Sequence, residues 1–164
     1  MNVLAPDLYY SHVTAIDLAD LAARGVSHLL IDLDNTLLPR DSSEISPQVR
    51  EWLDALGRHG MSACLVSNNW HGHVSGVADG LGLPIVAKAL KPFPAAFRRG
   101  LARIGGAPGT AAVIGDQIFT DVLGGNLLGM TTVLLAPLSH SDLPHTLALR
   151  RLERLVLAGR TPLA

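Results

Sequence analysis

The stretch LLIDLDNTLL, residues 29–38, is an aliphatic run that leads into two carboxylates separated by one residue. Short aliphatic runs of this kind are typical of strands that are buried on both faces of a parallel sheet. A single Asp or Gly would suffice to end such a strand, so the pair Asp32 and Asp34 requires another explanation. We therefore take this strand end as the first candidate for a functional site.

Four more strand-sized aliphatic runs follow along the chain: SACLVS (62–67), PIVAKAL (84–90), AAVIGD (111–116) and TTVLLA (131–136). Segments with helical spacing lie between or after them, near residues 46–60, 72–81, 94–104, 120–128 and 142–158. The chain thus alternates strand and helix, which predicts a doubly wound α/β fold. We expect a three-layer sandwich of the Rossmann type, with a five-stranded parallel sheet and right-handed crossovers.

The bulk properties limit the class of protein. At 164 residues the chain has the length of one domain, so residues 1–164 are predicted to form a single domain. The 13 basic and 14 acidic side chains nearly balance, so no nucleic acid is expected as a partner. The start lacks the pattern of a signal peptide, and no run approaches the roughly 20 apolar residues that cross a bilayer. The single cysteine, Cys64, lies in an apolar run and suits a reducing compartment, so we expect a soluble cytoplasmic protein.

Ligands of doubly wound folds bind beyond the carboxyl ends of the strands. Four of the predicted strands deliver polar side chains to that edge: Asp32 and Asp34, then Ser67 and Asn68, then Lys91, then Asp116 and Asp121. Carboxylates in contact repel one another strongly unless a cation neutralises them, so a divalent metal ion is implied. The candidate ligands are all hard oxygens, which favours Mg2+.

A magnesium ion beside a carboxylate, a lysine and a hydroxyl is typical of phosphoryl transfer. The two acids of the first motif can then have different roles. Asp32 would attack phosphorus and form an aspartyl phosphate, while Asp34 would protonate the leaving oxygen and later activate the water that releases phosphate. The sequence therefore predicts hydrolysis of a phosphate ester.

Each of these positions, taken alone, also has a structural explanation: an ordinary turn after a strand for Asp32, Asp34 and Asp116, a strand end for Ser67, a solvated cation for Lys91 and a helix N-terminus for Asp121. The combination of all of them at one edge of the sheet favours the functional interpretation. The motif WHGH at 70–73 contains two histidines without further ligands, and such histidines are more often surface residues than zinc ligands.

Four motifs of the chain resemble those of a known family: DLDNTL (32–37), VSNN (66–69), KP (91–92) and GDQIFTDVLGGN (115–126). They are similar to the motifs of the haloacid dehalogenase (HAD) superfamily, and most closely to its YqeG branch of class IIIA phosphatases. PDLY (6–9) and RRLERLVL (150–157) extend the resemblance over nearly the whole chain. The resemblance implies a HAD-like fold and phosphatase activity.

The resemblance also implies a role for each site residue. Asp32 is the nucleophile and Asp34 the general acid and base, and both belong to the magnesium site, Asp34 through its main-chain carbonyl. The remaining assignments are Asp116 as a direct Mg2+ ligand, Asp121 as a ligand or an orienter of metal-bound water, Ser67 and the Asn68 amide as donors to the phosphoryl oxygens, Lys91 as the partner of Asp32 and of the phosphoryl charge, and Thr36 as the residue that orders the first loop of the phosphate-binding site.

The chain departs from the family pattern at several positions. Lys88 competes with Lys91 for the role of the functional lysine, but the family pattern places Pro directly after that lysine, which favours Lys91. The family usually has basic side chains soon after SNN and an arginine after GGN, where this chain has Trp70 and His71 in the first place and Leu127 in the second. Substrate recognition is therefore the part of the resemblance that transfers least.

Many related phosphatases insert a cap domain after the first or second motif. Between Thr36 and Ser67 there is room for one loop and one helix, and between Ser67 and Lys91 for one helix and one strand, so we expect no cap domain. An open site suits a phosphate displayed on something large, or a lid lent by a second subunit in a homodimer.

The YqeG branch is similar to the phosphatidylglycerophosphate phosphatases of mitochondria and plastids, which makes a phospholipid headgroup the leading substrate candidate. The last predicted helix carries three arginines and four apolar side chains: Arg150, Arg151, Arg154, Leu147, Leu152, Leu155 and Val156. This helix can dock at an anionic membrane surface as a peripheral contact, or it can pack its apolar residues on the sheet.

Two further hypotheses stay open. The chain can be a phosphatase of small soluble phosphomonoesters, such as sugar phosphates or nucleotides, because these enzymes share all the motifs. It can also be a non-catalytic binding module of the same fold, such as a partner of a GTPase or of ribosome assembly. The binding module is disfavoured because no catalytic position is missing.

Overall fold

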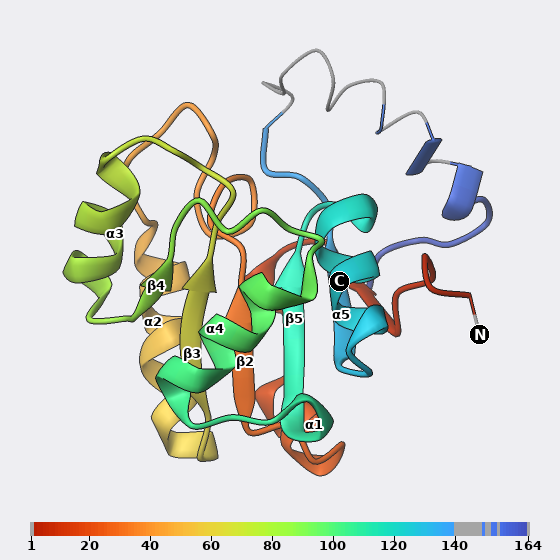
Figure 1. The fold of residues 1–164 in the computed structure, drawn as a ribbon, viewed down its shortest axis with the longest axis horizontal. Helices are drawn as coiled ribbons and strands as arrows, with labels where there is room; N and C mark the ends of the chain where they lie inside the picture. The colour runs from red at the N-terminus through yellow and green to blue at the C-terminus, as the bar shows by residue number, and fades with distance from the viewer. Residues whose placement is uncertain (1, 140–148, 150–151, 154, 164) are drawn as a thin grey trace.

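The computed structural model describes residues 2–139, 149, 152–153 and 155–163. It contains a parallel sheet of six strands in the order β1-β6-β5-β2-β3-β4 (Figure 1). The strands are β1 (Leu8–Tyr10), β2 (His28–Ile31), β3 (Ser62–Val66), β4 (Ile85–Val86), β5 (Ala111–Gly115) and β6 (Thr131–Leu135). The predicted α/β fold with a parallel sheet is therefore confirmed.

Helical segments connect the strands. The α-helices are α1 (Leu18–Ala23), α2 (Pro47–Ala55), α3 (His73–Leu81), α4 (Pro94–Ile104) and α5 (Leu123–Leu127). Shorter segments are the 3-10 helices η1 (Val13–Ala15), η2 (Leu56–His59) and η3 (Pro108–Thr110), and the π-helix η4 (Ile118–Val122). Helix α2 begins where the sequence predicts, because Ser46 Oγ accepts the N–H of Val49 at 3.3 Å and Pro47 occupies the first turn.

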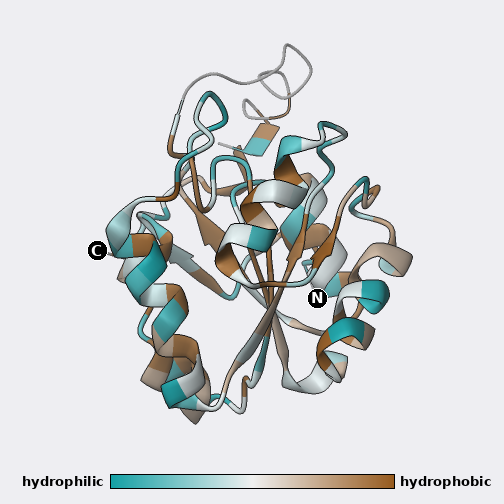
Figure 2. Cartoon of the chain, turned by 90° about the vertical axis from the view of Figure 1, so that its left-hand side faces the viewer, coloured by the Kyte–Doolittle hydropathy of each residue, from teal (hydrophilic) through white to brown (hydrophobic). Residues whose placement is uncertain are grey.

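The two faces of the sheet carry separate cores, because successive side chains of a strand point to opposite faces. Leu29 and Ile31 of β2 belong to one core, together with buried residues of α1, α2 and α3. Leu30, between them, belongs to the other core with Phe97 of α4. Figure 2 shows the largely hydrophobic strands lying between helices on either side. The fold is thus a sandwich of three layers.

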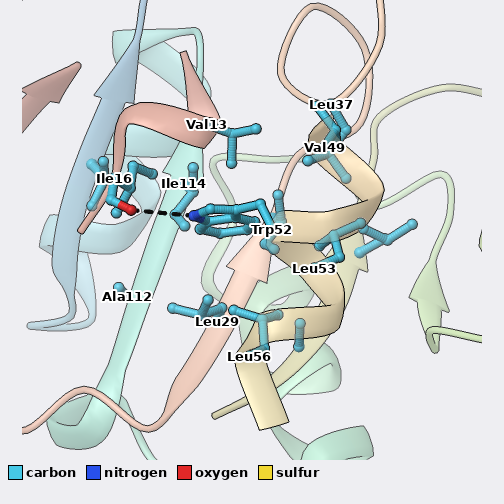
Figure 3. Packing of buried hydrophobic residues seen from close by; sticks show 14 of the residues in the cluster. Val13, Ile16, Leu29, Leu37, Val49, Trp52, Leu53, Leu56, Ala112 and Ile114 are labelled. Atoms are coloured by element: carbon cyan, nitrogen blue, oxygen red, sulfur yellow. Dashed lines mark hydrogen bonds between the residues drawn. The ribbon is translucent and has the colours of Figure 1, made fainter. Parts of the chain in front are cut away.

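The core on the face of α2 is centred on a buried tryptophan (Figure 3). Trp52 is 8% exposed, and its indole N–H donates to the carbonyl oxygen of Ile16 at 3.2 Å. A buried indole needs such an acceptor, so this hydrogen bond ties α2 to the segment that follows η1. Other apolar side chains of α2 and of the turn after it are buried beside it, at Val49, Leu53 and Leu56.

The prediction of five strands was wrong, because the sheet has six. The additional strand, β1, has three residues and lies at the edge of the sheet, where it pairs with β6. Leu8 and Tyr9 are only half-buried. An edge strand of this length lacks the long aliphatic run by which the other strands were recognised, which explains why the sequence did not reveal it.

The fourth strand is shorter than the run at 84–90 predicts. Lys88 has φ 51° and Leu90 has φ 63°. Both angles are in the left-handed region and outside the β region, so the chain leaves the sheet after Val86 and forms a loop that leads to Lys91.

Helix α1 was not predicted. The last predicted helix, 142–158, lies largely outside the described residues.

The order of connections creates a switch point in the middle of the sheet. From β2 the chain moves outward to β3 and β4, with α2 and α3 on one face. From β5 it moves in the opposite direction to β6, with α5 beside α4 on the other face. β2 and β5 are neighbours, so the crevice at their carboxyl ends is where ligands of such folds bind. Asp32 follows β2 directly, and Asp116 follows β5.

Candidate active site

Three charged side chains from different strand ends meet at the switch point. Lys91 Nζ lies 2.6 Å from Asp32 Oδ1 and 2.6 Å from Asp121 Oδ1. All three residues are buried, with exposed fractions of 7% for Lys91, 8% for Asp32 and 2% for Asp121. Asp116 is also buried, and one carboxylate oxygen from each of the three aspartates lies within 4.8 Å of the others. We call these four residues the site floor.

The loop after β2 is shaped so that both of its carboxylates face the site. Leu33, between them, is fully buried in the core, which turns Asp32 and Asp34 to the other side of the chain. Asn35 has φ 61°, a left-handed conformation that Asn tolerates better than most residues. Thr36 Oγ1 donates to Asp32 Oδ2 at 3.1 Å. The sequence DLDNT therefore both presents and orients the first carboxylate.

Asp34 is positioned from the neighbouring strand. Asn69 Nδ2 donates to Asp34 Oδ2 at 2.9 Å, and the backbone N–H of Asn69 donates to Ser67 Oγ at 3.0 Å. The sequence analysis did not assign a role to Asn69. The repeated Asn in VSNN was the available signal, but the contact depends on the pairing of β2 with β3, which the residue types alone do not reveal.

Asn68 holds the loop that carries the lysine. Its Oδ1 accepts the backbone N–H of Lys91 at 2.7 Å, and its Nδ2 donates to the carbonyl oxygen of Lys91 at 3.2 Å. The peptide bond between Lys91 and Pro92 is cis. Two hydrogen bonds from one side chain to one residue fix the backbone from which the ammonium group reaches the floor.

Asp121 reaches the floor from the π-helix η4. Such wide turns are rare and are frequently found at functional sites. Its Oδ2 accepts the backbone N–H of Gln117 at 3.3 Å. Gly115 makes room for it, because a Cβ atom at that position would collide with the carboxylate of Asp121. In the motif GDQIFTD, the second aspartate thus reaches the floor because the π-helix directs it there and because the glycine leaves room for it.

The pKa values of one base and one acid in the floor are raised, for different main reasons. Burial opposes the charge of Lys91, but the carboxylates of Asp121 and Asp32 outweigh it and raise the pKa of the ammonium above its usual value. Burial raises the pKa of Asp121 to about 6; Lys91 lowers it and the charge of Asp32 raises it. Asp32 contributes to both shifts, because its negative charge favours the ammonium form of Lys91 and disfavours the ionised form of Asp121. A floor of this composition favours a bound cation.

The floor opens into a cleft with a volume of about 610 Å3. Its lining includes Asp32, Asp34, Asn68, Asn69 and Lys91. The lining also includes four exposed or half-buried residues that we call the cleft mouth: Arg40, Trp70, His71 and His73. The rings of His71 and His73 stack with their centroids 6.2 Å apart. The mouth is therefore aromatic and basic, while the floor is acidic.

The structure brings most of the predicted site residues together. Asp32, Asp34, Asn68 and Lys91 line the cleft, and Asp116, Asp121 and Thr36 lie buried around it. Ser67 is fully buried and is not part of the cleft lining. Lys88, the competing lysine, is exposed and lies over the ring of Trp70, with Nζ 5.2 Å from the ring centroid. The described residues contain one group of three or more potential metal ligands, and neither histidine of WHGH belongs to it.

The fold and the site can now be compared with known proteins. A family described as HAD-hydrolase-like matches residues 89–142. A solved structure of a HAD phosphatase from Thermococcus onnurineus superposes with a TM-score of 0.59 at 18% identity, covering 82% of this chain and 99% of that chain. These similarities define the class of protein: the chain has the HAD fold, and part of it matches a family of HAD-like hydrolases.

A sequence relative narrows the class further. The probable phosphatase YqeG of Bacillus subtilis is 37% identical over 154 residues, which cover 94% of this chain and 90% of that protein. The chain therefore belongs to the YqeG family of phosphatases. A chloroplastic phosphatidylglycerophosphate phosphatase 1 from Chlamydomonas reinhardtii is 28% identical over 170 residues, covering 98% of this chain and 61% of that protein. The family resemblance inferred from the sequence motifs is confirmed.

Within the residues that the structure describes, no helix combines the length and the apolar character needed to cross a bilayer.

Proposed function

We propose that this chain is a Mg2+-dependent phosphomonoester phosphatase that works through an aspartyl phosphate on Asp32, with phosphatidylglycerophosphate as the leading substrate. The position of Asp32 carries the proposal. One of its oxygens accepts a hydrogen bond from Lys91 and the other from Thr36, and its carboxylate lies in the lining of the cleft. A carboxylate held on both oxygens at a cleft floor is preorganised as a nucleophile.

The floor fits a magnesium ion by its donor chemistry. The carboxylates of Asp32, Asp116 and Asp121 are hard oxygen ligands, and one oxygen of each lies within 4.8 Å of the others. We propose these three side chains as the metal ligands, with Asp121 acting directly or through water, and the main-chain carbonyl of Asp34 as a fourth. When bound, Mg2+ would offset the negative charge of the transferred phosphoryl group.

The first chemical step would use both acids of the first motif. A carboxylate oxygen of Asp32 forms a bond to phosphorus, while the bond from phosphorus to the leaving oxygen breaks. Asp34, whose Oδ2 is held by Asn69, gives its proton to that leaving oxygen, so the product leaves as an alcohol. The ammonium group of Lys91 balances charge on Asp32 and on the phosphoryl oxygens.

The second step would return the enzyme to its starting state. Asp34, now ionised, takes a proton from a water molecule, and the water oxygen forms a bond to phosphorus. The bond between Asp32 and phosphorus breaks, and inorganic phosphate leaves. We propose that the Asn68 amide, from the cleft lining, and the hydroxyl of Ser67, just after β3, hold the phosphoryl oxygens, while Thr36 orders the loop.

The substrate proposal rests on similarity and on access. The chain is 28% identical to a protein named as a phosphatidylglycerophosphate phosphatase. The connections between β2 and β4 contain α2, η2 and α3, and we propose that no cap domain covers the cleft. An uncovered cleft can accept a phosphate that is displayed on a lipid headgroup. A homodimer in which a second subunit lends a lid is a further proposal, which sedimentation analysis can test.

Membrane docking through the last predicted helix remains a proposal without a structural test. Leu147, Arg150, Arg151 and Arg154 lie outside the described residues. Of the others, Leu152 and Leu155 are exposed and Val156 packs partly buried against Ile118 and its neighbours.

One experiment tests the function directly. Phosphate release is measured with phosphatidylglycerophosphate in detergent micelles, with sugar phosphates and nucleotides, and with a generic aryl phosphate, each with and without Mg2+. We expect Mg2+-dependent release that is fastest with the lipid and absent in Asp32→Asn. If a soluble phosphomonoester were turned over faster than the lipid, it would become the preferred substrate candidate. Activity that survives in Asp32→Asn would reject the aspartyl phosphate intermediate.

A further inference from the structure

Three large apolar side chains are exposed on two loops beside the cleft. Trp70 follows β3 and is 65% exposed, while Leu90 and Phe93 follow β4 and are 55% and 66% exposed. We call these three residues the apolar rim. Trp70 is also part of the cleft lining, so the rim is continuous with the mouth of the site. Both loops lie at the end of the sheet where its strands finish (Figure 1).

The two loops of the rim are fastened to each other by backbone hydrogen bonds. The N–H of Ala89 donates to the carbonyl oxygen of Ser67 at 3.0 Å, and the N–H of Lys88 donates to that of Asn69 at 3.3 Å. The N–H of Phe93 donates to the carbonyl oxygen of Leu90 at 3.1 Å. The rim is therefore built on a fixed backbone that also carries the functional side chains of the floor.

The backbone at Leu90 is held in an unfavourable conformation that turns its side chain outward. Its φ of 63° is left-handed, which is uncommon for a bulky residue. The residues on either side, Ala89 and Lys91, are buried, while Leu90 is not. Strained backbone of this kind persists where surrounding contacts enforce it, and it clusters at functional sites. The fold thus exposes an apolar side chain directly next to the lysine of the floor.

Cationic groups accompany the apolar rim. Lys88 Nζ lies 5.2 Å from the ring centroid of Trp70. The guanidinium of Arg99 donates to the carbonyl oxygen of Ala89 at 3.2 Å, which places its charge at the same loop. Aromatic and aliphatic side chains with adjacent Lys and Arg are the combination that binds the boundary between the headgroups and acyl chains of an anionic bilayer.

We propose that the apolar rim docks on the surface of a bilayer that contains anionic phospholipid, and thereby brings the cleft over the lipid headgroups. This inference rests on the proposed lipid substrate, whose phosphate would be displayed at that surface. It differs from docking through the last helix, because it uses residues of the β3 and β4 loops that border the site itself. The ring of Trp70 would lie in the headgroup region and Leu90 and Phe93 would reach the acyl chains.

The two tryptophans of the chain allow a direct test. Trp52 is buried in the core and Trp70 is exposed, so a change in emission on adding lipid reports Trp70. Vesicles of phosphatidylglycerol and phosphatidylcholine are titrated into the protein and compared with vesicles of phosphatidylcholine alone. We expect a blue shift and weaker quenching by acrylamide with the anionic vesicles. An unchanged spectrum together with no sedimentation with these vesicles would overturn the proposal.

Matched variants locate the contact. Leu90→Asn with Phe93→Asn removes two apolar side chains, and Asn tolerates the left-handed backbone at position 90. We expect this double variant to bind anionic vesicles about tenfold or more weakly, since each lost side chain withdraws one buried apolar group. The control is Leu127→Asn, because Leu127 is 53% exposed at the end of α5, just before β6 begins, at the opposite end of the sheet. Equal binding by the double variant and the wild type would overturn the proposal.

The test also separates docking from substrate choice, because vesicle binding is measured without substrate. Binding to anionic vesicles without hydrolysis of phosphatidylglycerophosphate would support docking and reject that lipid as substrate. Hydrolysis of the lipid in micelles without binding to vesicles would reject docking alone. A dimer that dissociates in the double variant, with no vesicle binding, would overturn the proposal and identify a second copy of the chain as the occupant of the rim.

Discussion

The floor and the mouth of the cleft are built on opposite principles. In the floor, Asp32, Lys91 and Asp121 are buried, and each is fixed by hydrogen bonds to the others or to the backbone. In the mouth, Trp70 and His71 are exposed and project from a loop that follows β3. The strand ends and the hydrogen-bonded turns that follow them hold the first region in place, whereas the second includes exposed side chains on a loop.

This difference separates chemistry from recognition. A floor that is held before substrate arrives requires little rearrangement during phosphoryl transfer, which is the main source of electrostatic catalysis. In the proposed mechanism, the mouth would contact only those parts of a substrate that extend beyond its phosphate. Substitutions in the floor should therefore affect every substrate, and those in the mouth should affect large substrates most.

The largest effect is expected at Asp32, the proposed nucleophile. Asp32→Asn keeps the size of the side chain but removes its negative charge, so turnover of an aryl phosphate should fall by about 1,000-fold or more. The control is Asp54→Asn, which makes the same chemical change at an exposed residue of α2, outside the floor. Binding of the phosphate mimic beryllium fluoride in the presence of Mg2+ is measured for the wild type and for Asp32→Asn. Only the wild type should bind it. Retention of a tenth of the activity by Asp32→Asn would break the distinction between floor and mouth.

The second effect concerns the lysine between the two acids. Lys91→Met leaves the buried carboxylates of Asp32 and Asp121 without their shared partner, which should cost about 3 to 5 kcal/mol of folding stability without metal. Mg2+ should restore part of that loss because it would supply positive charge to the same group. Turnover should fall by roughly 100-fold, since an ammonium group beside the phosphoryl oxygens is lost.

Thermal unfolding with and without Mg2+ measures the stability change, and kcat measures the catalytic one. The matched control is Lys88→Met, which removes an exposed ammonium from the same loop and should change stability by less than about 0.5 kcal/mol. If Lys91→Met and Lys88→Met behaved alike, the buried ion pairs would not be what organises the floor.

The contrast between the two regions also explains what the sequence could reveal. Asp32 and Asp116 were predicted at the site because an aliphatic run marks the strand before each, and a parallel sheet brings strand ends to one edge. Lys91 was preferred to Lys88 because Pro92 follows it. The contact of Asn69 with Asp34 joins residues 35 apart and depends on how β2 and β3 pair. Patterns of residue type predict which segments are strands, but they do not specify such side-chain contacts.

Other features could not be predicted from the sequence, because of their short length or their backbone geometry. β1 was missed because its three residues lie at a half-buried edge. The π-helix that carries Asp121 has no distinctive periodicity over five residues. The direction of the Leu90 side chain depends on a left-handed backbone conformation, which the sequence does not predict at a residue other than glycine.

A smaller effect is expected from the glycine beneath Asp121. In Gly115→Ala the new Cβ would collide with the carboxylate of Asp121, so that carboxylate must move away from the floor. Turnover should fall by about tenfold, because a displacement near 1 Å of a positioned group has consequences of this order or larger. The Mg2+ concentration for half-maximal activity should rise in parallel.

The control for this change is Gly109→Ala, where a Cβ would meet no atom within 4 Å and φ is not left-handed. It should leave both turnover and Mg2+ dependence unchanged. If Gly115→Ala lowered stability but not the Mg2+ dependence, Asp121 would serve the fold and not the metal site, and the floor would be smaller than proposed.

The smallest effect on a small substrate is expected at the mouth. His71→Ala and His73→Ala remove two exposed rings from the cleft lining and leave every contact of the floor in place. With an aryl phosphate, kcat should change by no more than about threefold, while KM for phosphatidylglycerophosphate in micelles should rise, because only the larger substrate reaches past the phosphate. His59→Ala, at an exposed position in η2, is the matched control. A tenfold loss of kcat with the aryl phosphate would mean that these histidines act on the reacting group, and the boundary between floor and mouth would have to be drawn farther out.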